Sequence, residues 1–266
     1  MAAFAACAGD APYVDAKAIR ERFDKITEAE IEALGQKRIL FASRSFGLNL
    51  MNGFRHLAKE DPRIRFPLGY VRYDVFRAGG DLGVIPADVF EQHRFVHFLC
   101  TYWPHTKRVE EVDTLMRRPP HEFGRNVDAV IIFFHTARPD AVEPYARGMD
   151  ALQRDFPHAR MIYVTAGFMG PSREKENEAA HAFSEAIRAR YKGKAPLYDL
   201  GAILSDDFRA GHAYAPEYSK DPAEIHPNQP AGEIMMAKGF LLVLVEAFRG
   251  EETPAATSPA GRNRRP

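Results

Sequence analysis

The chain has 266 residues, and its 36 Lys and Arg residues balance 36 Asp and Glu residues to a formal net charge of zero. It therefore lacks the overall basic charge that attracts nucleic acid. Hydrophobic residues make up 45% of the sequence and charged residues 27%, which is typical of a globular protein, and no apolar run approaches the roughly 18 residues that a membrane-spanning helix needs.

The first 14 residues are predicted to lie outside the folded domain. In MAAFAACAGDAP a short apolar segment precedes Cys7, as at the cleavage site of a bacterial lipoprotein signal, but no Lys or Arg precedes it. One interpretation is export, with a periplasmic location and a lipid anchor at Cys7. The other is a disordered, Ala-rich terminus of a cytoplasmic protein. The second cysteine, Cys100, leaves too few thiols for a disulfide framework or a zinc site.

Helical and strand patterns then alternate along a predicted domain of residues 15–250. In chain order we expect a helix at 15–35, a strand at 38–42, a helix at 46–59, a strand at 70–76, a partly helical region at 84–120, a strand at 128–134, a helix at 141–155, a strand at 161–165, a helix at 174–191, a strand at 196–199 and a helix at 231–248. Residues 251–266, rich in Pro, Ala, Ser and Arg, are predicted to form a disordered tail.

The repeated strand–helix alternation predicts a single α/β domain. Its sheet should be parallel and doubly wound, with helices on both faces in three α/β/α layers of the flavodoxin-like type. In such sheets the functional site lies beyond the carboxyl ends of the strands. We therefore expect the segments 43–45, 78–80, 135–138 and 166–167 to line one crevice.

Ser45 is the first candidate for chemistry. It follows the expected strand ILFA and precedes a helix, so it should lie at a helix N-terminus, where backbone N–H groups favour an anion. A serine nucleophile needs a donor for the developing oxyanion, and its own N–H can serve. The structural alternative is that Ser45 only caps the helix, because serine is a common N-cap residue.

His226 is the candidate general base. It lies in a polar loop just before the last expected helix, in EIHPNQPAGE, and a loop histidine outside the core is available for proton transfer. The structural alternative is a helix-capping or solvent-exposed histidine. Each residue alone is a weak signal.

Together the two residues carry a resemblance to the SGNH (GDSL-like) hydrolases, of the bacterial serine esterase type. ILFASRS resembles the strand-Gly-Asp-Ser block of that family, SFGLNLMNGF resembles a bacterial subgroup, and HPNQPAGEIMMAKGFL resembles its final block. NEAAHAFSEAIRARY and PLYDLGAI are similar to later segments of the subgroup. The resemblance spans residues 38–248.

The resemblance implies that Ser45 is the nucleophile and His226 the general base of an esterase that works through an acyl-enzyme. It implies no metal and no organic cofactor. The implied substrate is a small-molecule or polysaccharide ester, with an O-acyl group on a carbohydrate as one option. Nothing in the sequence predicts the oligomeric state.

The oxyanion donors depart from the family pattern. Among three glycines after the second expected strand, Gly80 is preferred as a donor. The usual asparagine after the third core strand is absent from FFHTARPD, so His135 or Thr136 would donate instead. Arg138 either binds an anionic group of the substrate or belongs to a structural turn.

The acid that should orient His226 also departs from the pattern, because Ala223 stands three residues before it. Asp221 is favoured, Glu224 is the alternative acid, and a backbone carbonyl is a third possibility. Arg44 beside the serine either selects an acidic substrate or marks an altered, inactive site.

Two rival functions follow from these departures. One is a catalytically weakened binding or accessory protein of the same fold. The other is a doubly wound nucleotide- or phosphate-binding protein, with Ser43, Arg44 and the glycines 79–80 around a phosphate. The basic pairs 107–108 and 117–118 are expected on a solvated face. The aromatic residues Phe95, Phe98, Tyr102 and Trp103 are expected in the core or at a substrate wall.

Overall fold

One seven-stranded sheet organises the protein. The computed structural model describes residues 11–101, 106–134 and 137–251. All strand pairs are parallel, in the order β1-β7-β6-β5-β2-β4-β3. The strands are β1 (Tyr13–Val14), β2 (Ile39–Ser43), β3 (Tyr70–Tyr73), β4 (Phe95–Leu99), β5 (Ala129–Ile132), β6 (Arg160–Val164) and β7 (Leu197–Tyr198).

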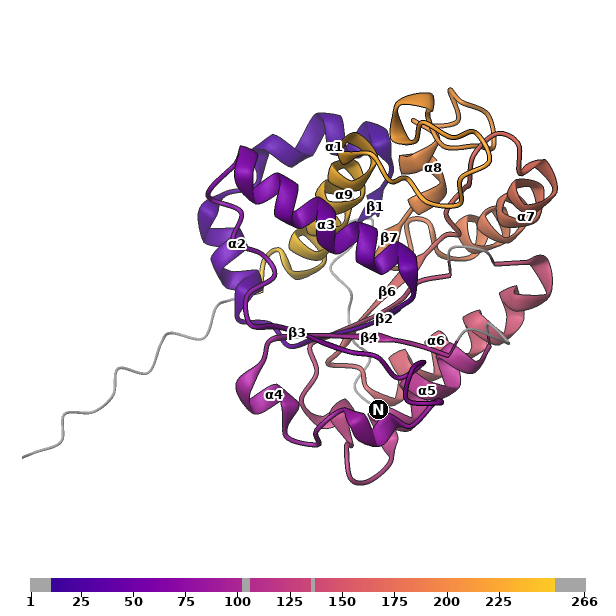
Figure 1. Ribbon diagram of the computed structural model, residues 1–266. Coiled ribbons are helices and arrows are strands. Elements are labelled where there is room, and N and C mark those ends of the chain that lie inside the picture. Colours follow the sequence, from indigo (N-terminus) through magenta and orange to yellow (C-terminus); the bar gives the residue numbers. More distant parts are fainter. Residues whose placement is uncertain (1–10, 102–105, 135–136, 252–266) are drawn as a thin grey trace, which may run out of the picture.

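Helices cover both faces of this sheet (Figure 1). One layer contains α1 (Ala16–Arg22), α2 (Glu28–Gly35), α3 (Ser45–Glu60), α8 (Leu200–Leu204) and α9 (Pro230–Phe248). The other contains α4 (Val89–Gln92), α5 (Lys107–Arg117), α6 (Val142–Asp155) and α7 (Glu174–Tyr191). Short 3₁₀ helices connect them at η1 (Phe23–Lys25), η2 (Leu82–Val84), η3 (Phe123–Arg125), η4 (Pro139–Ala141) and η5 (Pro216–Tyr218).

The alternation of side chains along β2 explains the two apolar layers. Ile39 and Phe41 pack into the core under α3 and α9, whereas Leu40 and Ala42 pack into the core on the opposite face. Successive side chains of a strand point to opposite faces, so a strand that is apolar throughout must be covered on both sides. The predicted three-layer, doubly wound fold class is thereby confirmed.

The strand order places a switch in winding direction at β2. The chain builds β3 and β4 on one side of β2 and then crosses to β5, β6 and β7 on the other. The five strands β4-β2-β5-β6-β7 follow the flavodoxin order, with β3 and β1 added at the edges. Ligand crevices of such sheets open at the switch, beyond the carboxyl end of β2.

Three local expectations differ from the structure. The region 84–120, expected to be helical in parts, contains the buried strand β4, whose pattern FVHFL is interrupted by a polar His97. The helix expected at 15–35 is divided, because Thr27 begins a second helix with a capping box to Glu30. The sheet also begins at Tyr13, two residues before the expected start of the domain at 15.

One expected surface residue is buried. Arg108, expected on a solvated face, is fully buried, donates to the Phe133 carbonyl at 2.6 Å and lies 5.3 Å from the ring centre of Phe134. Phe95 and Phe98 belong to the core, as one interpretation held. The calls on Cys7, Tyr102, Trp103 and most of the tail fall outside the described residues.

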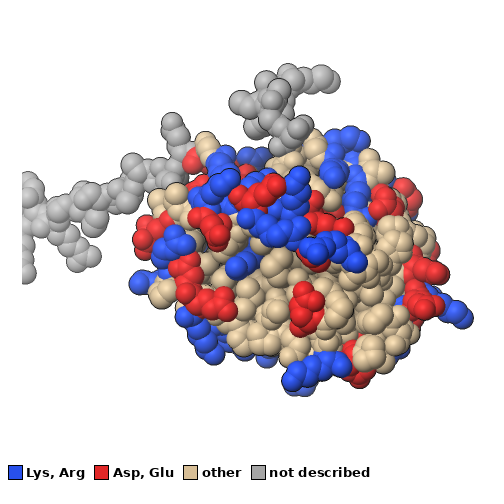
Figure 2. Space-filling view, turned by 90° about the horizontal axis from the view of Figure 1, so that it is seen from above, with Lys and Arg blue, Asp and Glu red and all other residues tan. Residues whose placement is uncertain are grey.

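The outer surface carries charges of both signs. Figure 2 shows Lys and Arg interleaved with Asp and Glu, beside an area where charged side chains are sparse. Over residues 11–101, 106–134 and 137–251, no helix combines the length and the apolar character that crossing a membrane requires.

A buried carboxylate ties β7 to α7. Asp199 is fully buried and accepts hydrogen bonds from Arg188 at 2.5 and 2.8 Å, Tyr13 at 2.6 Å and Thr165 at 2.9 Å. Burial opposes its ionisation, but the hydrogen bonds and charge of Arg188 outweigh burial and lower the pKa of Asp199. The pair is therefore charged at neutral pH.

We expect Asp199→Asn to destabilise the fold at pH 7 by about 3–5 kcal/mol, because the buried Arg188 loses its buried counter-charge and keeps only the exposed Glu185. A lowered pKa confers stability that is complete above the unfolded value of about 4 and is lost as pH falls through the folded value. Urea unfolding of the variant and wild type should therefore converge in acid. Glu143→Gln, at an exposed pair with Arg190, should cost below about 1 kcal/mol. If the difference in unfolding free energy between Asp199→Asn and wild type persisted unchanged in acid, the charged Asp199–Arg188 pair would not be its cause.

Candidate functional site

Ser45 is the first residue of α3, directly beyond the carboxyl end of β2. The N-cap of this helix is Arg44, not Ser45, and no side-chain cap bond is present. Ser45 is half-buried. The first N–H groups of a helix lack intrahelical acceptors and carry partial positive charge. Ser45 thus lies where a developing anion would be stabilised, and its position is not explained by capping.

The packing of α3 against α9 fixes the position of the α3 N-terminus. Gly53 allows the close approach, since a Cβ atom there would lie 1.9 Å from the Glu233 carbonyl oxygen. The buried Glu233 carboxylate accepts hydrogen bonds from Asn49 at 2.9 Å and Asn52 at 3.1 Å, and lies 3.3 Å from His56 Nε2. Ser45 begins α3, and α9 follows the loop of His226. The α3–α9 contact therefore fixes the positions of the two candidate residues relative to each other.

His226 lies beside the start of α3. Its ring centre is 5.4 Å from that of Phe46, the residue after Ser45. Phe46 is in turn close to the segment after β6, because a Cβ atom at Gly167 would lie 2.8 Å from its ring. The structure therefore brings the start of α3, the His226 loop and the segment after β6 together, which include two of the four segments expected to line one crevice, 43–45 and 166–167.

The His226 loop is fastened to the segment that follows β6. The Gly170 N–H donates to the Glu224 carbonyl at 2.9 Å, and the Ser172 N–H donates to the Pro222 carbonyl at 3.1 Å. Asn177 of α7, which sequence reasoning passed over, binds the backbone of Met169 and Gly170 through three hydrogen bonds of 2.7 to 3.2 Å. These backbone contacts hold the loop over the carboxyl end of β6.

Glu224, and not the favoured Asp221, contacts His226. The Glu224 Oε1 atom lies 3.4 Å from His226 Nδ1 and accepts hydrogen bonds from the backbone N–H groups of Ile225 and His226. These two amides, Ile225 first, hold the pKa of Glu224 below its usual value, so the carboxylate is ionised at neutral pH. The Asp221 carboxylate instead accepts from the Ala223 N–H at 2.8 Å.

The backbone N–H of Gly80 already makes a hydrogen bond within its own loop. It donates to the Val75 carbonyl at 2.8 Å, and its φ of 91° lies in the left-handed region that glycine tolerates. The expected role of Gly80 as an oxyanion donor therefore conflicts with this geometry. Among the described residues, a Cβ atom at Gly80 would meet the Thr101 hydroxyl, at 3.5 Å.

Arg44 spans the loops after β3 and β4. Its guanidinium donates to the Cys100 carbonyl at 2.8 Å and lies 3.9 Å from the ring centre of Phe76. Arg138 is exposed and lines a cavity of about 410 Å³ with Pro139 and Lys175, at the start of α7. His135 and Thr136 lie outside the described residues.

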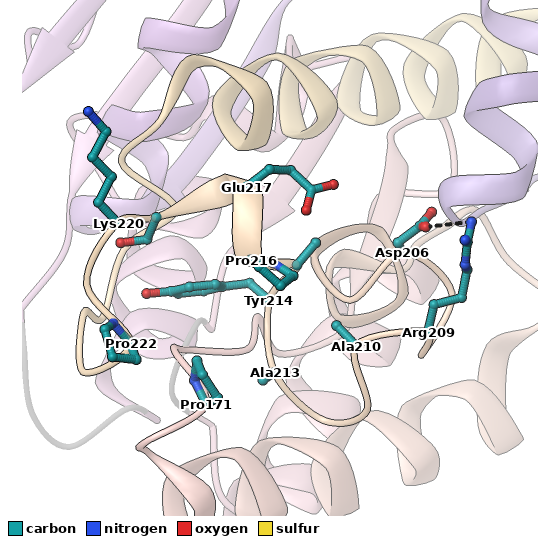
Figure 3. Close-up of a pocket in the computed structure, with 12 residues that line it drawn as sticks. Pro171, Asp206, Arg209, Ala210, Ala213, Tyr214, Pro216, Glu217, Lys220 and Pro222 are labelled. Atoms are coloured by element: carbon teal, nitrogen blue, oxygen red, sulfur yellow. Dashed lines mark ion pairs between the residues drawn. The ribbon is translucent and has the colours of Figure 1, made fainter.

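A cavity of about 590 Å³ adjoins the His226 loop. Figure 3 shows Pro171, Pro222 and the Tyr214 ring at one end and the Asp206–Arg209 ion pair at the other. The Tyr214 hydroxyl donates to the Glu224 carbonyl at 2.9 Å. Neither Ser45 nor His226 lines this cavity, so it is distinct from the position of the candidate catalytic residues.

In the part of the chain that the structure describes, no group of three His, Cys, Asp or Glu side chains is placed to hold a metal ion.

No family model matches the chain, and no curated protein matches it significantly. A solved structure described as a provisionally assigned platelet activating factor from Streptococcus pneumonia is 14% identical, with 86% of this chain and 97% of that chain covered and a TM-score of 0.45. A likeness of this degree establishes neither a shared fold nor a shared activity.

Gly53→Ala tests the α3–α9 contact. The new methyl group would overlap the Glu233 backbone, which cannot move aside as a side chain can, so we expect a loss of about 1–3 kcal/mol in urea unfolding. Lys59→Ala, on the exposed side of α3, should change stability by less than about 0.5 kcal/mol. Equal effects of the two variants would show that close packing at Gly53 does not hold the helices.

Proposed function

We propose that the protein is a serine hydrolase that cleaves a carboxylic ester, with Ser45 as nucleophile and His226 as general base. The observation that carries the proposal is the placement of His226 beside Phe46, at the N-terminus of the helix that begins with Ser45. The resemblance of the surrounding segments to the SGNH hydrolases supports the same roles. Arg44, and not Ser45, occupies the N-cap position of α3, which supports a role for the serine other than capping.

The mechanism follows from these positions. Ser45 Oγ attacks the acyl carbon while its proton passes to His226, and the first turn of α3 stabilises the negative charge on the acyl oxygen. The ester C–O bond then breaks, and the leaving alcohol takes the proton from His226. Water, deprotonated by His226, attacks the acyl-enzyme and releases the carboxylic acid and free Ser45.

Glu224 acts in this proposal as the group that orients His226. Its carboxylate is charged at neutral pH and lies 3.4 Å from His226 Nδ1, so it favours the imidazolium that forms during proton transfer. The contact is longer than the usual hydrogen bond. We therefore assign Glu224 a smaller contribution than a fully buried aspartate makes in a serine protease.

The substrate class rests on the resemblance. We propose an O-acyl group on a small molecule or a carbohydrate, with neither metal nor organic cofactor. Arg44 already donates to the Cys100 carbonyl, but its charge lies next to Ser45, which favours a substrate with an acidic group nearby.

A binding protein of the same fold is the second candidate. The commitment of the Gly80 amide to Val75 favours it, because one expected oxyanion donor is lost. Such a protein would keep its affinity for the ester and would not form a covalent adduct.

Intact mass after treatment with a fluorophosphonate serine probe separates the two candidates. Wild type should gain one adduct, Ser45→Ala none, and His226→Ala should react at least about a thousandfold more slowly. Ser172→Ala, at an exposed serine, should behave as wild type. An adduct that survives in Ser45→Ala, or a folded wild type without any adduct, would refute the proposed hydrolase.

The choice of acid is tested by Glu224→Gln against Asp221→Asn. Loss of the charge next to His226 Nδ1 should slow adduct formation by about 10- to 1,000-fold, less than the roughly 10⁴-fold effect of the buried aspartate in a serine protease. Asp221→Asn should change the rate by less than about threefold, because that carboxylate binds only a neighbouring amide. A larger loss in Asp221→Asn would reverse the assignment.

A further inference from the structure

Three neighbouring strands carry a buried chain of polar side chains beneath the start of α3. Ser43 ends β2, His97 lies in β4 and Tyr70 begins β3. The Ser43 Oγ atom is 2.6 Å from His97 Nε2, and the Tyr70 hydroxyl is 3.1 Å from His97 Nδ1. Ser43 and His97 are fully buried and Tyr70 is partly buried. Ser43 cannot itself be reached by a substrate.

Only one arrangement of protons serves every contact in this chain. Ser43 Oγ–H donates to the Arg44 carbonyl at 3.1 Å, so it has no proton left for His97. His97 must then donate from Nε2 to Ser43 Oγ and accept the Tyr70 hydroxyl proton at Nδ1. Burial lowers the pKa of His97 to about 3, which keeps the ring neutral and this tautomer available across the working pH range.

This series of hydrogen bonds ends at the Arg44–Ser45 peptide group, directly before the candidate nucleophile. The Arg44 carbonyl accepts two hydrogen bonds, one from Ser43 Oγ at 3.1 Å and one from the Gly47 N–H at 2.9 Å. A trans peptide is planar, with its C=O and N–H pointing in opposite directions. Fixing the Arg44 carbonyl toward Ser43 and Gly47 therefore fixes the Ser45 N–H in the opposite direction, away from them.

Gly47 permits this arrangement. A Cβ atom at this position would lie 1.8 Å from Ser43 Oγ and 2.9 Å from His97 Nε2. The first turn of α3 thus rests directly on the Ser43–His97 contact, with no side chain between them. Loss of the Ser43 hydroxyl therefore acts directly on the helix start.

We propose that Tyr70, His97 and Ser43 form a positioning relay that orients the Arg44–Ser45 peptide, so that the Ser45 N–H faces the oxyanion of the acyl-transfer step. The inference rests on the proposed hydrolase function for its chemical meaning. The three residues act through Arg44 and do not touch the substrate. The relay also accounts for the complete burial of Ser43 and His97, with the Phe41 ring stacked on His97 at 4.7 Å between ring centres.

Two variants interrupt the relay at different points. Ser43→Ala removes the donor to the Arg44 carbonyl, and Tyr70→Phe removes only the far hydroxyl and is the milder change. Phe41→Leu is the matched control, because it alters the packing on His97 without removing a hydrogen bond. All three are compared with wild type in the full-length chain.

The first measurement is the crystal structure of each variant. The relay predicts that the Arg44–Ser45 peptide rotates or takes two orientations in Ser43→Ala and keeps the wild-type orientation in Phe41→Leu. An unchanged peptide in Ser43→Ala would overturn the relay. This result does not depend on activity, so it decides the relay even where wild type proves to be inert and the proposed function fails.

The second measurement is the hydrolysis of p-nitrophenyl acetate. Removing an oxyanion donor outright costs about 10²–10³ in kcat, so a misdirected one should lower kcat about 10- to 100-fold in Ser43→Ala, with a smaller loss in Tyr70→Phe. KM should stay within about twofold, because the lost interaction belongs to the transition state. If Phe41→Leu loses as much kcat as Ser43→Ala, the three residues serve only the packing and the relay is refuted.

Discussion

The close packing of α3 on α9 is the constraint on which the rest of the site depends. Gly53 lets α3 come into direct contact with the backbone of α9 at Glu233. The Glu233 carboxylate accepts hydrogen bonds from Asn49 and Asn52 of α3. A buried carboxylate is costly unless it is hydrogen-bonded, so this register of the two helices is strongly preferred over a shifted one. The helix that begins at Ser45 and the helix that follows His226 are therefore held as one unit.

The two candidate residues are held in position by different kinds of structure. Ser45 stands on a rigid element, between a central strand and a long helix, and the peptide before it is held from below by Ser43. His226 stands on a loop, and backbone contacts from Gly170 to Glu224 take the place of regular structure. Sites on strands and helices are more precise than sites on loops. The loop is thus the part of the site where substrate binding would alter geometry most easily.

Local patterns predicted much of this arrangement, and non-local contacts explain what they missed. The apolar run before Ser45 and the polar loop around His226 are short-range signals, and they placed both residues at the correct ends of their elements. The strand β4 was overlooked because His97 interrupts its apolar run, and the partner that makes this histidine acceptable, Ser43, comes from another strand. The contact of Glu224 with His226 depends on local loop geometry that spacing alone does not define.

The central claim is that Ser45 and His226 act together on one ester bond, Ser45 by attacking the acyl carbon and His226 by transferring the proton. It is tested most directly by the crystal structure of the protein after reaction with a fluorophosphonate. The account predicts phosphorus bonded to Ser45 Oγ, a phosphoryl oxygen facing the first turn of α3, and a His226 ring nitrogen within about 3 Å of a phosphorus-bound oxygen. Phosphorus on another residue, or on Ser45 with His226 turned away from it, would contradict the claim.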